Sequence, residues 1–450
     1  MKALLISTYE LGRQPFGLAS PAAYLRRDGV DVTCADLSVD PFPVEAAAAA
    51  DLVAFYVPMH TATRLTAPLL RRVKALNPAA TLCCYGLYAP VNEPYLRGLG
   101  ADAILGGEFE EGLAGLCRRL REQGPSPQTE PVISLRRQRF LVPDRLGLPP
   151  LSRYAQLCAN DRPPRVVGYV EASRGCKHLC RHCPVVPVYG GKFRVVQPGV
   201  VLRDIRQQVE AGATHITFGD PDFFNGIGHA LPLVRALHRE HPGVSYDVTV
   251  KIEHLLRHAD ALPVLCDTGC ALVTTAVEAI DDRILAILDK GHTREDFIEV
   301  VRLFRETGLT LNPTFIPFTP WTSLEGYREL LALLRDLDLT DAVAPIQLTI
   351  RLLIPAGSRL LELPEVQALV GPFEAERLSH AWAHPDPRVD ELHRQVTALV
   401  RERRDAPRRE VFASLWRCAH RALRRSDPLP ESYFLRPPAA IPYLTEPWYC

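Results

Sequence analysis

Short apolar runs of strand length alternate with longer amphipathic segments along most of this chain. Over residues 1–122 the strand-like runs are KALLIS, DVTCADL, LVAFYVP, ATLCCYGL and ADAILGG. Strands that alternate with helices form parallel sheets, because a parallel pair needs a long crossover that is usually a helix. This pattern predicts a doubly wound α/β domain, in which ligands are expected beyond the carboxyl ends of the strands.

A second series of the same kind begins at residue 165. A stretch rich in proline and polar residues precedes it over 123–164 and predicts a linker. Six strand-like runs then follow: RVVGYVEA, HITFGD, SYDVTVKI, ALVTTAVE, TLNPTFIPF and IQLTIRLL. Because a closed barrel needs eight strands, 165–358 is expected to form an open, partial (β/α)6 barrel with its site at the carboxyl ends of the strands. Residues 359–450 are expected to form a helical extension.

The charge and hydropathy of the chain argue against several classes of protein. Lysine plus arginine and aspartate plus glutamate number 52 each, so no net field favours nucleic acid or an anionic membrane as a partner. No run approaches the length of about 18 apolar residues that a membrane span needs. In the opening MKALLISTYELG, the apolar run is too short for a signal peptide, and the residues that follow it are too polar. The sequence therefore predicts a cytoplasmic protein that binds neither nucleic acid nor membrane.

Three of the twelve cysteines lie close together in EASRGCKHLCRHCPVV. Cys176, Cys180 and Cys183 follow the first strand of the second series with the spacing C-x3-C-x2-C. In a reducing compartment, clustered thiols indicate metal or redox chemistry rather than disulfides. No fourth cysteine lies nearby to complete a tetrahedral zinc site, and three thiolates suit a [4Fe-4S] cluster with one open iron. A zinc knuckle that uses a distant fourth ligand is the alternative.

This loop and its position after a first strand resemble those of radical S-adenosylmethionine (SAM) enzymes, over about residues 165–355. In that family the open iron binds the amino and carboxylate groups of SAM, and an electron from the cluster breaks a carbon–sulfur bond. The resemblance implies a [4Fe-4S] cluster and SAM as cofactors, a small-molecule substrate, and a reductant protein such as flavodoxin or ferredoxin. The position before the last cysteine, usually aromatic, is His182, whose ring is expected near the adenine.

Further segments resemble the family in the expected order. FGDPDFFN, at the end of the second strand, is similar to the Gly-Gly-Glu-Pro element that binds the SAM ammonium, and this implies that role for Gly219, Asp220 and Pro221. Aspartate stands where glutamate is usual, so its reach is shorter. TTAVEAIDDRILAILDKGHT resembles the fourth-strand segment, which implies that Glu278 approaches the nucleoside hydroxyls.

Some of the acidic and basic side chains have a purely structural alternative. Asp220 or Asp222 would serve equally as a helix N-cap after the strand. Arg351, in LTIRLL on the sixth strand, would either hold a carboxylate of a bound ligand or form a salt bridge inside the barrel mouth.

The N-terminal region has a resemblance of its own. GLYAPVNEPYLRGLGADAILGGEFEEGLAGL is similar to the last third of the cobalamin-binding domains that precede many radical SAM enzymes, including the pair Gly107 and Glu108. The Asp-x-His-x-x-Gly element that supplies an axial histidine in many such domains is absent, and TYELGRQPFG stands in its place. His60 is the only imidazole nearby. Cobalamin is therefore compatible with the sequence but is not implied by it.

The chain closes with AAIPYLTEPWYC. This segment resembles the tail of the CUAEP/CCAEP group of radical SAM proteins, in which a Cys-Cys or Cys-selenocysteine pair precedes Ala-Glu-Pro. The resemblance implies that an in-frame UGA follows the Cys450 codon and is read as selenocysteine. Such a pair would be a catalytic or soft ligand group, suited to a thiophilic metalloid or to a redox relay. A tail that merely packs Trp448 and Tyr449 on the barrel is the alternative.

The sequence thus predicts an enzyme that cleaves SAM reductively and modifies a small molecule by hydrogen abstraction or carbon-centred group transfer. Cobalamin-dependent methyl transfer and aminocarboxypropyl transfer to a thiophilic metalloid are the enzymatic alternatives. An iron–sulfur electron carrier and a zinc-stabilised interaction protein are the alternatives that are not enzymes. The metal found after anaerobic reconstitution would separate iron from zinc, and SAM cleavage would separate an enzyme from a carrier.

Overall fold

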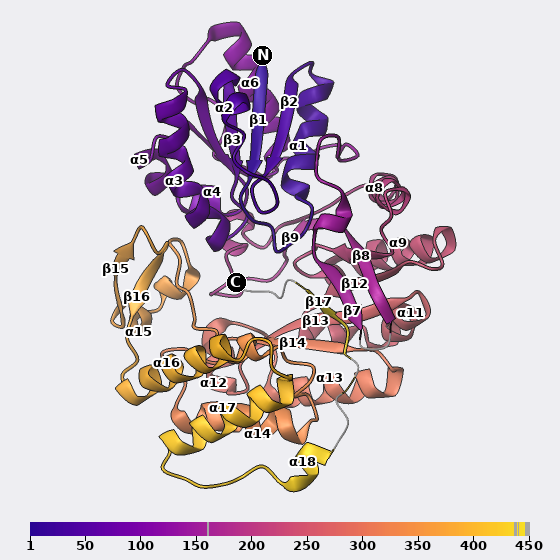
Figure 1. Cartoon of the computed structure of the whole chain (residues 1–450), viewed down its shortest axis with the longest axis vertical. Helices are drawn as coiled ribbons and strands as arrows, with labels where there is room; N and C mark the ends of the chain where they lie inside the picture. Colours follow the sequence, from indigo (N-terminus) through magenta and orange to yellow (C-terminus); the bar gives the residue numbers. More distant parts are fainter. Residues whose placement is uncertain (160–161, 436–438, 440, 446–450) are drawn as a thin grey trace.

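The structure is a computed structural model that describes residues 1–159, 162–435, 439 and 441–445. Two α/β units lie one above the other in Figure 1, and helices of the C-terminal region pack beneath the lower one. The upper unit contains a six-stranded sheet with the order β2-β1-β3-β4-β5-β6, and every neighbouring pair in it is parallel. The predicted doubly wound sheet is confirmed.

The elements of the upper unit alternate strand and helix as the sequence predicts. Its strands are β1 (Lys2–Ser7), β2 (Asp31–Asp36), β3 (Leu52–Tyr56), β4 (Thr81–Tyr85), β5 (Ala103–Gly107) and β6 (Ile133–Ser134). Its helices are α1 (Phe16–Arg27), α2 (Val44–Ala49), α3 (His60–Leu76), α4 (Tyr88–Val91), α5 (Glu93–Gly98) and α6 (Glu110–Gln123). All residues of β3, β4 and β5 are buried, because two separate apolar cores cover the two faces of the sheet.

The carboxyl ends of the upper strands face the second unit. The chain begins at the far end of β1 in Figure 1, and β1 runs from there toward the lower unit. The order β2-β1-β3 places the reversal of strand order between β1 and β3. In a doubly wound sheet this is the position where a crevice for a ligand is expected.

The lower unit contains a seven-stranded sheet with the order β14-β13-β12-β11-β8-β7-β17. Five of its strands are parallel: β8 (Arg162–Val170), β11 (His215–Phe218), β12 (Ser245–Thr249), β13 (Cys270–Glu278) and β14 (Leu311–Phe315). At one edge, β7 (Gln156–Ala159) is antiparallel to β8, and β17 (Tyr443–Leu444) is antiparallel to β7 and so runs in the direction of β8. The curled, open sheet confirms the predicted partial barrel.

The sixth expected strand is much shorter than its sequence suggests. The first three residues of IQLTIRLL, 346–348, form a single turn of 3-10 helix together with the preceding Pro345. The pairing with the barrel is reduced to one parallel bridge between Phe318 and Arg351. The helical turn takes the first residues of the run out of an extended conformation, so the pairing starts only after it.

Helices connect the barrel strands and cover their outer face. They are α7 (Val186–Tyr189), α8 (Pro198–Glu210), α9 (Ile227–Glu240), α10 (Ile252–Arg257), α11 (Leu262–Asp267), α12 (Asp282–Leu288), α13 (Arg294–Thr307) and α14 (Leu324–Asp336). A short antiparallel pair, β9 (Ser173–Gly175) and β10 (Phe193–Val195), flanks the segment that contains the three clustered cysteines.

The predicted helical extension is present and shares the core of the barrel. It contains α15 (Pro364–Gln367), α16 (Pro387–Glu402), α17 (Arg408–Ala422) and α18 (Glu431–Leu435), with a hairpin of β15 (Val370–Glu374) and β16 (Ser379–Trp382). Buried residues of α16 and α17, such as Leu392 and Trp416, belong to the same apolar cluster as the barrel strands. Among the described residues, no helix combines the length and the apolar character that crossing a membrane requires.

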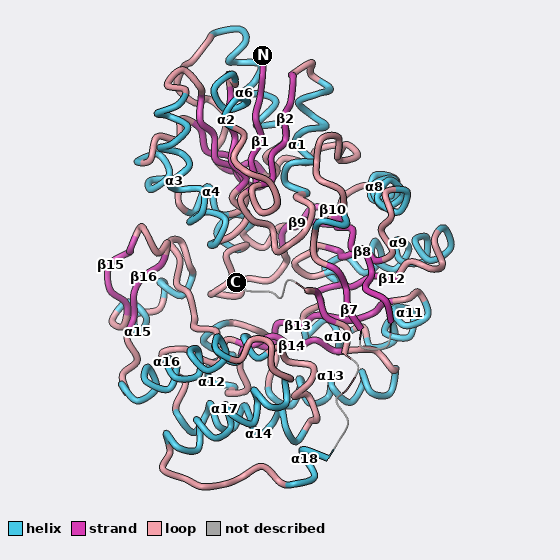
Figure 2. Tube along the Cα trace, viewed as in Figure 1, coloured by secondary structure: helices cyan, strands magenta, loops and turns pink. Residues whose placement is uncertain are grey.

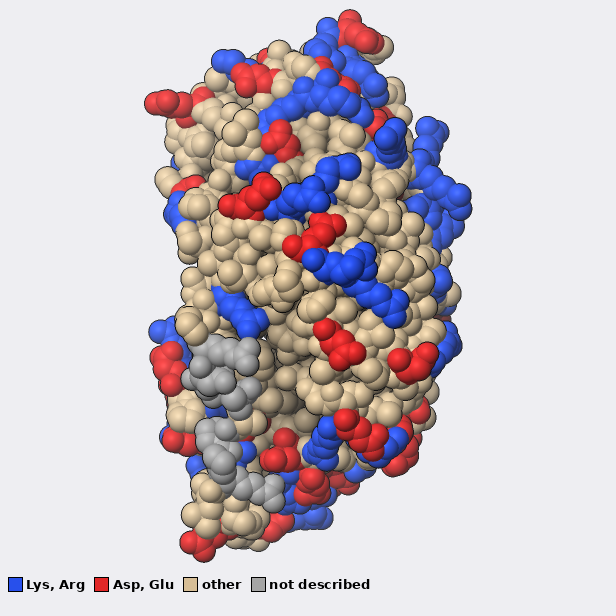
Figure 3. Space-filling view, turned by 90° about the vertical axis from the view of Figure 1, so that its right-hand side faces the viewer, with Lys and Arg blue, Asp and Glu red and all other residues tan. Residues whose placement is uncertain are grey.

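The segment between the two units runs mostly as loop (Figure 2). Arg145 fixes it in place: its guanidinium donates to both carboxylate oxygens of Asp204 on α8 at 3.0 Å, to Gln14 Oε1 at 2.7 Å and to the carbonyl of Tyr169 at 2.8 Å. One arginine therefore joins the loop after β1, the linker and the barrel. On the face shown in Figure 3, basic and acidic side chains are interspersed.

Replacing this arginine should destabilise the whole fold. Arg145→Met leaves the buried Asp204 carboxylate without its cation, and we expect a loss of about 3 kcal/mol in the free energy of unfolding. Urea denaturation measures the loss. Arg137→Met, at an exposed position in the same linker, is the matched control and should change stability by less than about 0.5 kcal/mol. Equal effects of the two substitutions would contradict this account of the linker.

Candidate functional site

The three clustered cysteines lie in the loop that follows β8 and β9, at the carboxyl edge of the barrel sheet. Gly175 precedes the first of them with φ +73°, and a Cβ there would come within 2.4 Å of the carbonyl oxygen of Lys192. Only glycine allows this conformation and this close approach. The loop then turns back on itself, with the amide of Cys183 donating to the carbonyl of Cys180 at 3.2 Å.

The protein surroundings of these thiols favour binding of a metal over free thiolates. Cys180 is buried, while Cys176 and Cys183 are partly exposed. Desolvation raises the pKa of Cys183 to about 12 and also raises the pKa of Cys176. A desolvated thiol loses its proton readily only when a cation replaces it, and the sulfurs of this loop could therefore hold a metal centre.

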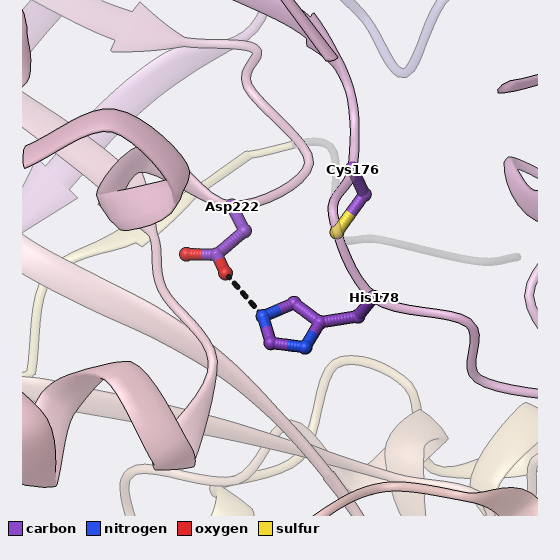
Figure 4. Close-up of side chains that lie close together, drawn as sticks. All are labelled: Cys176, His178 and Asp222. Atoms are coloured by element: carbon purple, nitrogen blue, oxygen red, sulfur yellow. Dashed lines mark ion pairs between the residues drawn. The ribbon is translucent and has the colours of Figure 1, made fainter. Parts of the chain in front are cut away.

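A second possible ligand set involves Cys176 together with His178 and Asp222. One ligand atom of each lies within 4.8 Å of the other two, and in Figure 4 the side chains of His178 and Asp222 point toward one another. The polar side chains of this set already have protein partners. His178 Nδ1 lies 3.0 Å from Lys251 Nζ, and Asp222 Oδ2 lies 2.6 Å from His254 Nδ1. This group is therefore a network of ion pairs and hydrogen bonds beside Cys176, and thiols are the softer and better donors for an iron or zinc centre.

Asp222 has a structural role in this network. Its Oδ1 accepts from the amide of Phe224, so it caps the short helix that begins there, as the alternative from the sequence proposed. Burial by itself would raise the pKa of Asp222, but hydrogen bonds from His178 and His254 outweigh burial and lower the pKa to about 2. The carboxylate is therefore charged over the whole working range of pH.

Gly219 and Asp220 lie directly beside the start of the cysteine loop. The Asp220 carboxylate accepts from the amide of Ala172 at 3.0 Å and from the hydroxyl of Ser173. A Cβ on Gly219 would come within 1.8 Å of the Tyr169 hydroxyl, so this position must be glycine. Pro221, which follows, is exposed. Burial raises the pKa of Asp220 to about 7 because the hydrogen bonds from Ser173 and Ala172 offset only part of the cost of desolvation.

His182 and Glu278 are brought together from opposite parts of the barrel sequence. Glu278 ends β13 with φ +68°, a left-handed conformation that is strained for a residue with a side chain and that is concentrated at functional sites. Its Oε1 lies 3.1 Å from His182 Nε2 and 3.3 Å from Lys290 Nζ. Burial opposes ionisation of Glu278, but the charge of Lys290 and the contact with His182 prevail and lower the pKa to about 2.

Arg351 does not join this group. Its guanidinium lies 2.6 Å from Asp390 of α16, donates to the carbonyl of Trp382 at 2.9 Å, and stacks 3.5 Å from the centre of the Trp382 ring. The salt-bridge alternative from the sequence describes this geometry. Cys450, with Trp448 and Tyr449, lies outside the residues that the structure describes.

The sequence did not identify several of the residues that surround the thiols. Lys251 and His254 follow the end of β12, and Asn225 accepts from the Cys176 thiol over 3.9 Å through its Oδ1. Lys290 is likewise buried, against Glu278. The available signal was their position just after barrel strands, since the carboxyl ends of parallel strands converge on one edge.

Comparison with known proteins agrees with this geometry. Residues 170–334 match the family model of the radical SAM superfamily. The chain is 29% identical over 205 residues to a tRNA-2-methylthio-N(6)-dimethylallyladenosine synthase of Chlorobium phaeovibrioides, a match that covers 42% of this chain and 45% of that protein. It is 24% identical to the hopanoid C-3 methylase of Methylococcus capsulatus, over 71% of this chain and 64% of that protein. The chain thus spans less than two thirds of the length of either relative.

Two solved structures share the fold over most of the chain. The cobalamin-dependent SAM radical enzyme OxsB, with aqua-cobalamin and SAM bound, superposes with a TM-score of 0.70 at 14% identity, covering 89% of this chain and 66% of that one. The radical SAM methyltransferase TsrM of Kitasatospora setae, with tryptophan and a SAM analogue bound, gives a TM-score of 0.63 at 18% identity, covering 82% and 76%. At these identities the likeness is one of fold.

The Asp222 network predicts a pH-dependent contribution to stability. Because the pKa of Asp222 is about 2 in the folded chain against an ordinary value of 3.8, its stabilisation is complete above about pH 4 and is lost as the pH falls through 2. We expect Asp222→Asn to lower the free energy of unfolding by about 2 kcal/mol at pH 6, with a smaller difference at pH 3. Denaturation at the two pH values measures it. Asp260→Asn, at an exposed position nearby, is the control, and a loss that is the same at both pH values would contradict the assignment.

Proposed function

Residues 170–334 form a radical SAM domain, and from that premise we propose that the chain is an enzyme that cleaves SAM reductively at a [4Fe-4S] cluster held by Cys176, Cys180 and Cys183. The proposed reaction modifies a small-molecule substrate by hydrogen abstraction or carbon-centred group transfer. The observation that carries the proposal is the position of the three thiols, in one loop at the carboxyl edge of the parallel half-barrel.

The donor set fits such a cluster. Three sulfur atoms leave one iron open, and that iron would take the amino and carboxylate groups of SAM. When bound, the cluster supplies the electron that breaks a carbon–sulfur bond. The chain's own contribution is to hold the three sulfurs in a loop fixed by Gly175, by Asp220 and by the Asn225 side chain, which also accepts from the amide of Lys177 at 3.2 Å.

The arrangement around Asp220 supports its assignment to the SAM ammonium. Its buried carboxylate has hydrogen-bond donors but no cationic side chain among the groups that mainly set its pKa. An ammonium group of a ligand would supply the missing charge through a charge-assisted hydrogen bond. Gly219 and Pro221 flank Asp220 and are proposed to shape the path by which the ammonium group reaches its carboxylate.

Glu278 and His182 are proposed to bind the nucleoside part of SAM. This proposal is supported by their contact of 3.1 Å, which brings a carboxylate and an imidazole ring together at the end of β13. Lys290 keeps Glu278 ionised, so the carboxylate acts as an acceptor and not as a donor. The contact of Arg351 with Asp390 supports a role for that arginine in attaching α16 to the barrel mouth.

The comparisons do not select a substrate. The relatives are named for a tRNA nucleoside and for a hopanoid, and these share no recognisable chemistry with each other. Small-molecule substrate, reductant protein and cytoplasmic location therefore stay predictions from the sequence. The same holds for selenocysteine after Cys450 and for aminocarboxypropyl transfer to a metalloid.

Loss of any one cluster ligand should abolish the reaction. We expect Cys176→Ala, Cys180→Ala and Cys183→Ala each to lose the brown colour and the iron of the reconstituted protein, together with cleavage of SAM by a chemical reductant, because each thiolate is a direct ligand. Iron analysis and chromatography of the SAM products measure both losses.

Cys418→Ala is the matched control, since Cys418 is a partly buried cysteine of α17 in the C-terminal extension. It should retain colour, iron and cleavage. Zinc in place of iron in the purified native chain, or SAM cleavage that survives in one of the three alanine variants, would contradict the proposed function.

A further inference from the structure

The carboxyl edge of the upper sheet is where a cobalamin would have to bind if this chain used one. A doubly wound sheet binds its ligands outside the carboxyl ends of its strands, at the reversal between β1 and β3. That edge faces the barrel and the cysteine loop. Whether a corrin fits there depends on what the chain itself places in this space.

The loop after β1 is bonded directly to the helix that follows β3. Thr8, just after β1, donates its hydroxyl to the carbonyl of Ala62 at 3.0 Å and lies 3.4 Å from the hydroxyl of Thr66, both on α3. Farther along the same loop, the guanidinium of Arg13 lies 4.9 Å from the centre of the Tyr169 ring on β8. The loop after β1 therefore contacts both α3, the helix that follows the neighbouring strand β3, and the barrel.

Aromatic rings fill the space between the strand ends and α1. Tyr56, Tyr85 and Phe109 lie at the ends of β3, β4 and β5, with ring centres 5.1 to 5.9 Å apart. The ring of Tyr56 presses so closely on α1 that a Cβ on Gly17 would lie 2.1 Å from it. Tyr85 donates its hydroxyl to the carbonyl of Gly17 at 2.8 Å. The bare glycine thus makes room for a side chain of this chain.

A buried charge cluster closes the remaining side of the edge. Arg174, two positions before Cys176, is 6% exposed and forms ion pairs with Glu110 and Glu171 at 2.6 Å and with Glu108 at 3.2 Å. Glu108 and Glu110 belong to the segment that leaves β5, whereas Glu171 directly follows β8 of the barrel. The end of β5 therefore contacts the start of the cysteine loop directly.

The histidine nearest to this edge is also engaged. His60 begins α3, and its Nε2 lies 2.7 Å from the carbonyl oxygen of Arg377 in the C-terminal region. The imidazole of His60 therefore points at a protein carbonyl. Among the described residues of the upper unit, no other histidine lies at the carboxyl ends of the strands.

We propose that the upper sheet of this chain binds no cobalamin and instead positions the cysteine loop through the ion pairs of Arg174. The proposal rests on the proposed function and narrows it to outcomes of SAM cleavage that need no corrin. Separating a buried ion pair is costly because it leaves an uncompensated charge. The ion pairs of Arg174 therefore hold the first residues of the cysteine loop in one position. The fold shared with cobalamin enzymes is then used here as a support for the cluster loop.

The first test measures corrin directly. The reconstituted iron-containing protein is incubated with excess hydroxocobalamin and SAM, freed of unbound corrin by gel filtration, and analysed for corrin absorbance, iron and SAM cleavage. We expect iron and cleavage without co-eluting corrin. One corrin per chain would overturn the proposal, while absence of iron or of cleavage in the same sample would count against the proposed function only.

The second test compares two neighbouring glutamates of α6. Glu110→Gln removes a carboxylate that pairs with Arg174, whereas Glu111→Gln changes an exposed residue of the same helix. We expect Glu110→Gln to alter the electron paramagnetic resonance spectrum of the reduced, SAM-bound cluster and to raise KM for SAM, with iron content retained. Glu111→Gln should match the native protein in both.

A milder substitution guards against a folding defect. Tyr189→Phe deletes only the hydroxyl that lies 3.4 Å from Glu108, so the buried shape is kept. It should shift the same spectrum in the same direction by a smaller amount. The positioning role of Arg174 would be refuted if Glu110→Gln and Tyr189→Phe both gave the native spectrum and the native KM. If Glu110→Gln fails to fold, a native spectrum and native KM in Tyr189→Phe alone would refute it.

Discussion

The guanidinium of Arg174 is buried where the two sheets meet, and it pairs with carboxylates from both of them. A charge removed from water to this extent is tolerated only when opposite charges and hydrogen bonds surround it. The pairing therefore demands a fixed distance between the end of β5 and the end of β8. Since Cys176 follows two positions later, the loop of the three cysteines starts directly from this interface.

Three buried carboxylates at the barrel mouth show how partners decide charge. Asp222 and Glu278 have cationic or imidazole neighbours, and both have a pKa of about 2. Asp220 is held by a backbone amide and a hydroxyl, and its pKa is about 7. The same kind of group is thus firmly ionised at two positions and half-protonated near neutrality at the third. This difference supports the proposal that the cation beside Asp220 is the ammonium group of SAM.

The likeness to OxsB and TsrM illustrates the separation of fold from site. The backbone of this chain follows theirs over 89% and 82% of its length, yet identity is 14% and 18%. Backbone topology places an edge of the upper sheet against the barrel, but the side chains decide what occupies it. In this chain that edge holds Tyr56, Tyr85 and Phe109, together with the carboxylates that pair with Arg174.

The sequence by itself determined the two α/β units, the open barrel and the loop of three cysteines, because strand–helix alternation and cysteine spacing are local properties of the chain. It also singled out Asp220 and Glu278, which stand at the ends of recognisable strands, and His182, which directly precedes the last cysteine of the loop. It overestimated the sixth strand, whose first residues form a turn of 3-10 helix instead. Only the tertiary structure decided the partners of the buried charges: Arg174 with Glu110, Asp222 with His254, Arg351 with Asp390. The partners are far apart in sequence, and nothing in the sequence distinguishes them from the other polar residues around them. Their pairing depends on which strand ends the fold brings to one edge.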